Sequence, residues 1–386
     1  MTPRYASHCF CLHHEPTAIL QGMLFRRLGT SGLQVPIISL GGWLTYGRTV
    51  NGDLVKDIIK YAFEAGINYF DTGFYLYVLA YLLSTKSPFT LAEAYANGRS
   101  EIEMGRVFRD LGIRRSDLII STKVFFGTGG KSPNDRGLSR KHVIEGTLQS
   151  LERLQMDYGM SRTPMSCANT DLSLVDILFA HRPDPNTPML EIVRAFNWLI
   201  DQGKTLYWGT SEWSAAQIQE AFDVAEKHNL HAPVAEQPLY NALQQHRFKK
   251  DLVPIFEKYG YGTTIYSPLA SSLLAGKYNN GIPPDSRYAK NADISYIKAL
   301  VDKLDSPEGK AQIGKVQALE AVAKDNFKGV TTAQLALAWV LKNPRVSTMI
   351  TGATSTEQLL ENLNALQVLP NLTEEIYNQI NEIFDA

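Results

Sequence analysis

The stretch Asn68-Tyr69-Phe70-Asp71-Thr72 has the pattern of a short apolar strand that ends on a carboxylate. Two later apolar runs also end on polar side chains, Lys123 in one and His181 in the other, and Tyr95 follows the first stretch. In a parallel β/α barrel the C-terminal ends of the strands meet at one mouth, and the active site lies there. These residues therefore predict a single active site at the mouth of a barrel.

The rest of the chain alternates apolar runs with segments of helical spacing. A β-hairpin is expected over residues 25–35. The expected strands are 37–40, 68–72, 118–124, 175–181, 206–211, 233–236, 263–267 and 347–351. The expected helices are 53–65, 100–111, 138–156, 188–202, 214–227, 249–259, 331–342, 356–366 and 373–384. The strand that ends at Ser267 is expected to lead into a long loop region.

Two details of the expected helices follow from local signals. Ser139 and Ser214 are expected to be N-caps. In the helix over 138–156 we expect one apolar face, made of Ile144, Leu148, Leu151 and Leu154.

Eight strands alternating with helices indicate an α/β fold with a parallel sheet. The length suits a (β/α)8 TIM barrel with an N-terminal β-hairpin and a C-terminal extra helix. The rival, an open doubly wound sheet, needs G-x-G-x-x-G between its first strand and first helix. Neither Gly41-Gly42-Trp43 nor Gly127-Thr128-Gly129-Gly130 supplies it, so we favour the barrel.

Composition narrows the class of protein. The 386 residues are 44% hydrophobic and 20% charged with a net charge of −1, which gives no case for nucleic acid or an anionic membrane. The longest apolar run, 74–83, is too short for the ~20 residues of a spanning helix, so no direct membrane insertion is expected. With three cysteines and no signal peptide, we expect a cytoplasmic protein. Cys9 and Cys11 with nearby histidines could bind a metal, but a disordered tail is favoured and no metal site is expected.

Polar residues end most of the expected strands: Asp71, Lys123, His181, Ser211, Glu236, Gln237 and Ser267. Each one alone has a structural explanation, such as capping a helix or bonding a backbone carbonyl. A packed barrel core needs none of them, so their recurrence on consecutive strand ends favours a functional site.

Several ordered motifs make the chain similar to a known family. They include Phe70-Asp71-Thr72, Arg136-Gly137-Leu138-Ser139-Arg140-Lys141-His142, Ser150-Leu151-Glu152-Arg153-Leu154-Gln155, Arg182-Pro183-Asp184-Pro185-Asn186-Thr187-Pro188, Tyr207-Trp208-Gly209-Thr210-Ser211 and Gln367-Val368-Leu369-Pro370. The chain resembles the aldo-keto reductases, and within them the potassium-channel β-subunit branch with its fungal and plant relatives. The resemblance to this family covers the chain from about residue 24 to residue 370.

The resemblance implies a catalytic tetrad of Asp71, Tyr95, Lys123 and His181. Tyr95 would be the general acid that protonates a carbonyl oxygen as hydride arrives at carbon. The charge of Lys123 would lower the tyrosine pKa, Asp71 would hold the lysine, and His181 would orient the carbonyl. Channel β-subunits often carry asparagine in place of His181, so the histidine favours a working reductase.

The resemblance also implies NADP(H), bound in an extended pose across the barrel mouth. Gly42 and Trp43 would follow the first strand, Ser211 and Gln237 would hold the carboxamide, and Tyr266 would stack on the nicotinamide. The pyrophosphate would lie against Ser267, Pro268, Leu269, Ala270 and Lys277. The adenosine and its 2′-phosphate would be held by Arg287, Gly352, Thr354, Gln358, Glu361 and Asn362. Glu212 departs from the channel subunits, which carry arginine, and we interpret it as a marker of the fungal and plant branch.

Two segments have no counterpart in the sequence pattern of this family. Residues 73–91 separate Asp71 from the Ala-Glu-x-Tyr motif, and residues 159–174 precede the strand that begins at Val175. Both begin with glycine and end with leucine, which suggests introns retained in frame, although genuine loop insertions remain the alternative. The expected organisation is a disordered extension over 1–22 and a barrel over 23–386 interrupted by these segments. Whether translation starts at Met1 or at Met23 is left open.

Two functions follow. The first is an NADPH-dependent reductase of aldehydes and ketones, with a small carbonyl compound as substrate. The alternative is a redox-sensing regulatory β subunit of a voltage-gated potassium channel with slow turnover. A homotetramer and a channel α subunit stay open as assembly partners, and no nucleic acid is expected. A third outcome, an inactive barrel, would follow if 73–91 fills the catalytic loop.

Overall fold

The computed structural model describes residues 22–42, 45–72, 98–128, 132–155, 173–284, 286–290, 292 and 295–385. Eight parallel strands close into a barrel in the order β10-β3-β4-β5-β6-β7-β8-β9. The strands are β3 (Ile38–Gly41), β4 (Tyr69–Asp71), β5 (Ile119–Val124), β6 (Val175–Ala180), β7 (Thr205–Ser211), β8 (Ala235–Gln237), β9 (Gly262–Ile265) and β10 (Thr348–Thr351). The predicted (β/α)8 barrel is therefore confirmed.

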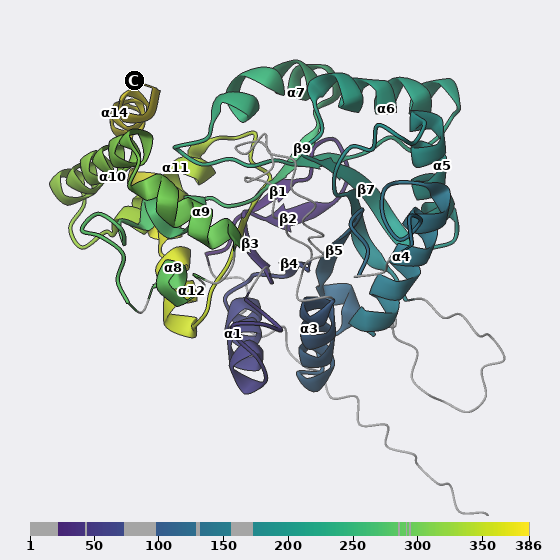
Figure 1. Ribbon diagram of the computed structural model, residues 1–386, viewed down its shortest axis with the longest axis horizontal. Coiled ribbons are helices and arrows are strands. Elements are labelled where there is room, and N and C mark those ends of the chain that lie inside the picture. Colours follow the sequence, from purple (N-terminus) through teal and green to yellow (C-terminus); the bar gives the residue numbers. More distant parts are fainter. Residues whose placement is uncertain are drawn as a thin grey trace, which may run out of the picture.

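Helices surround these strands (Figure 1). They are α1 (Asp53–Glu64), α3 (Arg99–Asp110), α4 (Arg140–Leu154), α5 (Met189–Asp201), α6 (Ala215–Lys227), α7 (Val253–Tyr259), α8 (Arg287–Lys290), α9 (Ser295–Leu304), α10 (Pro307–Asn326), α11 (Thr332–Lys342), α12 (Thr356–Leu363), α13 (Ala365–Val368) and α14 (Glu374–Asp385). Short turns of other helix types are η1 (Arg115–Asp117), η2 (Arg247–Asp251), η3 (Ala270–Ala275) and η4 (Leu369–Asn371).

Helix ends carry the signals that the sequence offers. The Ser139 hydroxyl accepts from the His142 backbone N–H, which confirms that N-cap. Ser214 forms a reciprocal capping box with Gln217 at the start of α6, so that prediction is also confirmed. These caps satisfy backbone N–H groups that a helix leaves unpaired at its start.

The N-terminal hairpin closes one end of the barrel. Its strands, β1 (Phe25–Arg27) and β2 (Gln34–Pro36), pair antiparallel, and Figure 1 shows them across the middle of the ring of helices. Leu28 and Val35 of the hairpin pack into one buried cluster with side chains from the barrel strands, Tyr69 among them. The Arg26 guanidinium donates to three backbone carbonyls at and beyond the end of α11, at 2.6 to 3.1 Å. The hairpin therefore covers the end of the barrel opposite the predicted site.

Two expectations were wrong in detail. The region after β9 is not a long loop: it contains α8, α9 and α10. Helix α10 begins after the N-cap Ser306, with Pro307 at its first helical position. In α4, Leu148 is 41% exposed and Ile144 is half-buried, whereas Val143 and Thr147 are buried with Leu151 and Leu154. Val143 and Thr147 thus replace Ile144 and Leu148 on the buried face, which includes small and polar side chains.

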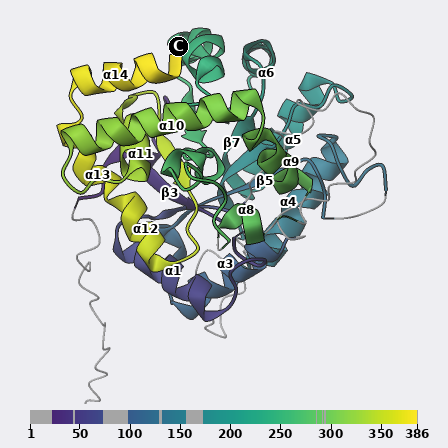
Figure 2. The ribbon, with the colours of Figure 1, turned by 60° about the vertical axis from the view of Figure 1, so that its left-hand side comes forward.

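Helix α11 is apolar on nearly every side because it is covered on nearly every side. All ten residues from Thr332 to Leu341 are buried. Helix α10 packs beside it and crosses the view of Figure 2 in front of α11. The Trp339 indole of α11 donates to Asn381 of α14 at 3.1 Å. The expected C-terminal extra helix is confirmed as α14.

Several predicted features lie outside the described residues. These are Trp43, Tyr95, the segment 73–91, most of 159–174 and nearly all of the N-terminal extension.

Candidate active site

A buried ion pair lies at the C-terminal ends of β4 and β5. The Lys123 ammonium donates to both carboxylate oxygens of Asp71, at 2.6 and 2.8 Å, and the two side chains are 1% and 0% exposed. The Ser121 hydroxyl donates to Asp71 Oδ1 at 2.6 Å. Neighbouring parallel strands put Asp71 opposite Ser121 in register, two residues before the lysine on the same strand. The strand register therefore fixes how the carboxylate and the ammonium meet.

Burial lowers the pKa values of two basic side chains near this carboxylate, Lys123 and His181. Burial lowers the pKa of Lys123 to about 8, although Asp71 acts in the opposite direction. Burial and the charges of Arg182 and Lys123 hold the pKa of His181 well below its ordinary value. His181 is therefore neutral at pH 7, and its ring packs edge-on against Phe126 with centroids 5.0 Å apart. A small cavity of about 60 Å³ touches Lys123, Phe126 and His181.

Ser211 and Gln237 lie side by side at the ends of β7 and β8. The Ser211 hydroxyl donates to the Gln237 backbone carbonyl at 2.9 Å. The Gln237 amide nitrogen is 3.4 Å from Asp71 Oδ1 and 3.2 Å from the Thr264 hydroxyl, both within its reach as a donor. These contacts link the predicted carboxamide residues to the predicted catalytic carboxylate. Tyr266, buried at 4% exposure, follows β9 next to Ser267.

A larger cavity of about 800 Å³ opens beside the ends of β3, β9 and β10. Nine of the predicted cofactor residues line it: Ser267, Pro268, Leu269, Lys277, Gly352, Thr354, Gln358, Glu361 and Asn362. Gly42 follows β3, and a Cβ there would come within 2.2 Å of the Ser100 hydroxyl oxygen. Ala270 lies partly buried in the same turn as Leu269. Arg287 starts α8, but its side chain is outside the described part of the structure.

The backbone along this cavity is unusual. Ser267, Ser271 and Ser272 all have left-handed φ angles, of 53°, 56° and 77°. Non-glycine residues seldom adopt this conformation, and it is held where the surrounding structure requires it. Two exposed lysines, Lys277 and Lys290, contribute to the lining. The N-terminus of α12 is close by, capped by Ser355. The donors gathered here suit an anionic ligand.

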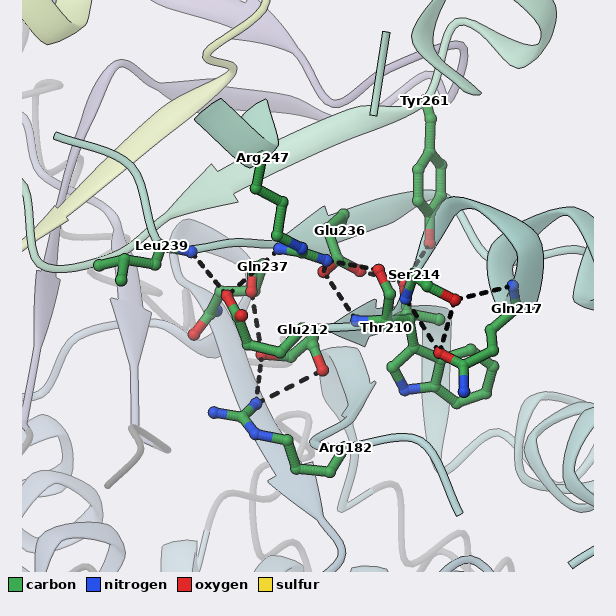
Figure 3. Close-up of polar contacts among 12 residues, drawn as sticks. Arg182, Thr210, Glu212, Ser214, Gln217, Glu236, Gln237, Leu239, Arg247 and Tyr261 are labelled. Carbon is green, nitrogen blue, oxygen red and sulfur yellow. Dashed lines mark hydrogen bonds and ion pairs between the residues drawn. The ribbon is translucent and has the colours of Figure 1, made fainter. Parts of the chain in front are cut away.

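Three groups in the site were not predicted from the sequence. Ser121 holds Asp71, and its spacing of two residues from Lys123 was the available signal. Arg182 donates from Nη1 to the Ser211 hydroxyl at 3.1 Å, and it follows His181 directly. Arg247 bonds two carboxylates next to Ser211 and Gln237 (Figure 3), and nothing in its sequence spacing indicates this.

The fold and the site define a (β/α)8 barrel protein with a buried Asp–Lys pair at its strand ends, and the sequence comparison gives its family. The aldo/keto reductase family model matches residues 37–159 and 162–385, so the chain belongs to the aldo/keto reductase family. The predicted resemblance is confirmed.

Relatives in fungi and plants make the similarity more specific. A putative voltage-gated potassium channel subunit beta of Schizosaccharomyces pombe is 47% identical over 374 residues, covering 97% of this chain and 95% of that protein. Probable voltage-gated potassium channel subunits beta of Oryza sativa subsp. japonica and Arabidopsis thaliana are each 43% identical over 366 residues, covering 94% of this chain and 97% of each protein.

The described residues lack two features, a helix suited to span a membrane and a group of side chains suited to bind a metal. Among them, no helix combines the length and the apolar character that crossing a membrane requires. Within the same residues, no three His, Cys, Asp or Glu side chains are grouped closely enough to hold a metal ion.

Proposed function

We propose that this protein is an NADPH-dependent oxidoreductase that reduces aldehydes and ketones to alcohols, with Tyr95 as the general acid. The observation that carries the proposal is the buried Asp71–Lys123 pair at the strand ends, beside a neutral His181. Membership of the aldo/keto reductase family supports the oxidoreductase class.

Each side chain then has a chemical task. A free tyrosine has a pKa near ~10, so Tyr95 needs a neighbouring positive charge to lower its pKa and make it a stronger acid for the carbonyl oxygen. Lys123 supplies that charge, and Asp71 keeps the ammonium in place. Neutral His181 can donate one ring N–H to the same oxygen without competing for the proton. The bound cofactor supplies the hydride.

The residues present fit NADP(H). A cavity of about 800 Å³ lies within the ~300–1,000 Å³ of ordinary ligand sites. Lys277 and the turn from Ser267 to Ser272 would hold the pyrophosphate. Ser211 and Gln237 would hold the carboxamide, and Tyr266 would face the nicotinamide. The choice of NADPH over NADH rests on Arg287 with Thr354 and Gln358, so Arg287→Ala should weaken NADPH binding.

The two additional segments decide how active the chain is. We propose that 73–91 and 159–174 interrupt a barrel that otherwise runs over 23–386. The first enters the catalytic loop between Asp71 and Tyr95 and is rich in aromatic and apolar residues, so it would obstruct the pocket. The second precedes β6 at the opposite end of the barrel, where length is tolerated.

The test compares two proteins, the chain as written and the chain without both segments. We expect aldehyde-dependent NADPH oxidation from the shorter protein and little from the longer one. Lys123→Met in the shorter protein is the negative control. Equal turnover from both lengths would refute the role given to 73–91, and no turnover from either would refute the reductase. Sequencing the mature mRNA across both junctions shows which protein is made.

A second candidate has support of its own, from the relatives. The fungal and plant proteins at 43–47% identity are named as channel β subunits. A regulatory subunit of this kind would bind NADP(H) as a redox sensor and turn over slowly, as a cytoplasmic tetramer on a channel α subunit. Copurification of a channel together with immeasurable turnover of the shorter protein would favour it.

A further inference from the structure

Arg247 lies between two carboxylates at the barrel mouth (Figure 3). Its Nη2 is 2.8 Å from Glu236 Oε1, and its Nη1 is 3.3 Å from Glu212 Oε1. Nη2 also donates to the Trp213 carbonyl. The Glu236 side chain is 0% exposed, and those of Glu212 and Arg247 are 18% and 25% exposed. The guanidinium therefore joins residues at the ends of β7 and β8, where the three side chains are largely shielded from solvent.

The two carboxylates are the chain neighbours of the proposed carboxamide residues. Glu212 directly follows Ser211, and Glu236 directly precedes Gln237. Because Ser211 and Gln237 are register partners on β7 and β8, fixing the two glutamates fixes the backbone on both sides of this pair. Arg247 itself does not belong to either strand.

Through Glu212, Arg247 is also connected to Tyr266, the residue that follows β9. Glu212 has a left-handed φ of 60°, and its Oε1 accepts from the Leu239 backbone N–H at 2.7 Å. Leu239 forms a β-bridge with Tyr266, the residue proposed to face the nicotinamide. A non-glycine residue holds a left-handed conformation only when its surroundings fix it, and here its carboxylate bonds Leu239 and Arg247. An arginine at position 212 would instead meet the like charge of Arg247.

Arg247 is held from outside the barrel. It is the first residue of η2, a π-helical turn, and such turns occur often at functional sites. Two contacts with α14 anchor the segment: Gln245 donates to Asp385 at 2.6 Å, and Lys249 donates to Asn381 at 3.0 Å. The arginine is therefore delivered to the site by a segment that is itself fixed.

The contact of Arg247 with Glu212 is more than a structural partner for the buried Glu236 carboxylate requires. Glu236 already accepts from the Thr210 hydroxyl at 2.5 Å and from the Trp213 backbone N–H at 3.1 Å. The extra link from Arg247 to Glu212 adds a connection between β7 and β8 that runs past Ser211 and Gln237.

We propose that Arg247 is a positioning residue for the nicotinamide end of the cofactor, which it serves by holding Glu212 and Glu236 and through them Ser211, Gln237 and Tyr266. The proposal rests on the proposed function, because it takes these three residues as the nicotinamide contacts. The proposal adds to the site a residue that does not itself contact the cofactor. The Arg247 guanidinium, shared between Glu212 and Glu236, sets the spacing between the ends of β7 and β8.

The test uses two ligands and the full chain. NADPH contains the nicotinamide, and 2′-phospho-ADP-ribose lacks it. Arg247→Lys keeps the charge but loses the two-pronged geometry. We expect this variant to bind NADPH roughly tenfold more weakly, as for one lost hydrogen bond, and to bind 2′-phospho-ADP-ribose within about twofold of wild type. Titration calorimetry measures both dissociation constants.

Three further variants keep the test decisive. Arg247→Met with Glu236→Gln removes both buried charges together, and Glu212→Ala leaves the Arg247–Glu236 pair intact; both should show the same selective loss. Arg115→Lys is the matched control, since Arg115 pairs with Asp176 at 2.7 Å at the other end of the barrel. It should lower the thermal midpoint and change neither dissociation constant.

The outcomes separate the two proposals. Equal weakening for both ligands, or unchanged NADPH binding in the Arg247 and Glu212 variants, would overturn the positioning role and leave the reductase standing. If neither the wild-type chain nor the chain without residues 73–91 and 159–174 binds either ligand, the proposed function is overturned and the positioning role with it.

Discussion

The Asp71–Lys123 pair gives a pH-dependent prediction for Asp71→Asn. Both side chains are buried, and burial already lowers the pKa of Lys123 to about 8 in the presence of the carboxylate. Removing Asp71 lowers this pKa further. Below pH 8 the variant therefore releases a proton that the wild-type protein keeps, rather than holding an unpaired ammonium in the barrel.

The magnitude follows from that proton. Each pH unit below a pKa of about 8 costs ~1.4 kcal/mol to deprotonate the lysine. We expect Asp71→Asn to lower the free energy of unfolding by about 1 kcal/mol at pH 7, about 3 kcal/mol at pH 6, and little above pH 8. If the lysine could not deprotonate, removing its buried carboxylate partner would lower the free energy of unfolding by about 3–5 kcal/mol at every pH.

The wild-type protein has the complementary pH dependence. Between pH 8 and 10.5 its native state has released the Lys123 proton while the unfolded chain still holds it. The unfolded state binds more protons in this window, so stability rises with pH there, by about 3 kcal/mol from this group. Lys123→Met should remove that rise.

The assay is urea unfolding of wild type and Asp71→Asn near pH 6, 7 and 8.5, each repeated in a Lys123→Met background. The pH-dependent loss should disappear when the lysine is absent. A loss equal at all three pH values, or a slope that persists without Lys123, would refute the reasoning. If the protein is the proposed reductase, the neutral amine should also lower turnover at pH 7 by roughly 10²-fold, the usual share of general acid–base catalysis.

Three more predictions concern other parts of the molecule. Gly42→Ala puts a Cβ within 2.2 Å of the Ser100 hydroxyl oxygen and should cost about 1–3 kcal/mol in urea unfolding, with Ser100→Ala restoring most of it. Lys277→Ala should weaken NADPH binding about fivefold in low salt and less in high salt, because this exposed cation lines the cavity; a salt-independent change would contradict this. Arg115→Met leaves the Asp176 carboxylate buried without its cation and should cost about 3–5 kcal/mol of stability, with NADPH affinity of the folded protein unchanged.

The barrel could be predicted because its signals are local. Each strand is a short apolar run, and helix starts such as those at Ser139 and Ser214 carry their capping residues within four positions. Asp71, Lys123 and His181 were identifiable because strand ends share one mouth in this fold.

The contacts of Arg247 could not be predicted from the sequence, because its long side chain connects segments that are distant in the chain. Arg247 reaches Glu212 across 35 positions in the chain, and no spacing rule connects them. The buried face of α4 was misplaced because Ile144 and Leu148 are the more apolar choices, whereas the small side chain of Thr147 fits where α4 packs. The helices after β9 were missed because α10 mixes polar and apolar residues on all sides, which weakens the periodic signal.

The seam of the barrel has a consequence for synthesis on the ribosome. The ring closes where β3 pairs with β10, and the Ser39 hydroxyl donates to the Met349 carbonyl at 3.3 Å across 310 positions of chain. Until residues 348–351 emerge, the nascent sheet keeps two unpaired edges, at β3 and at β9. Open strand edges invite pairing with other chains, and contacts this distant form slowly. The nascent protein is therefore most exposed to aggregation just before its last strand is released, when nearly all of its core residues have already been made.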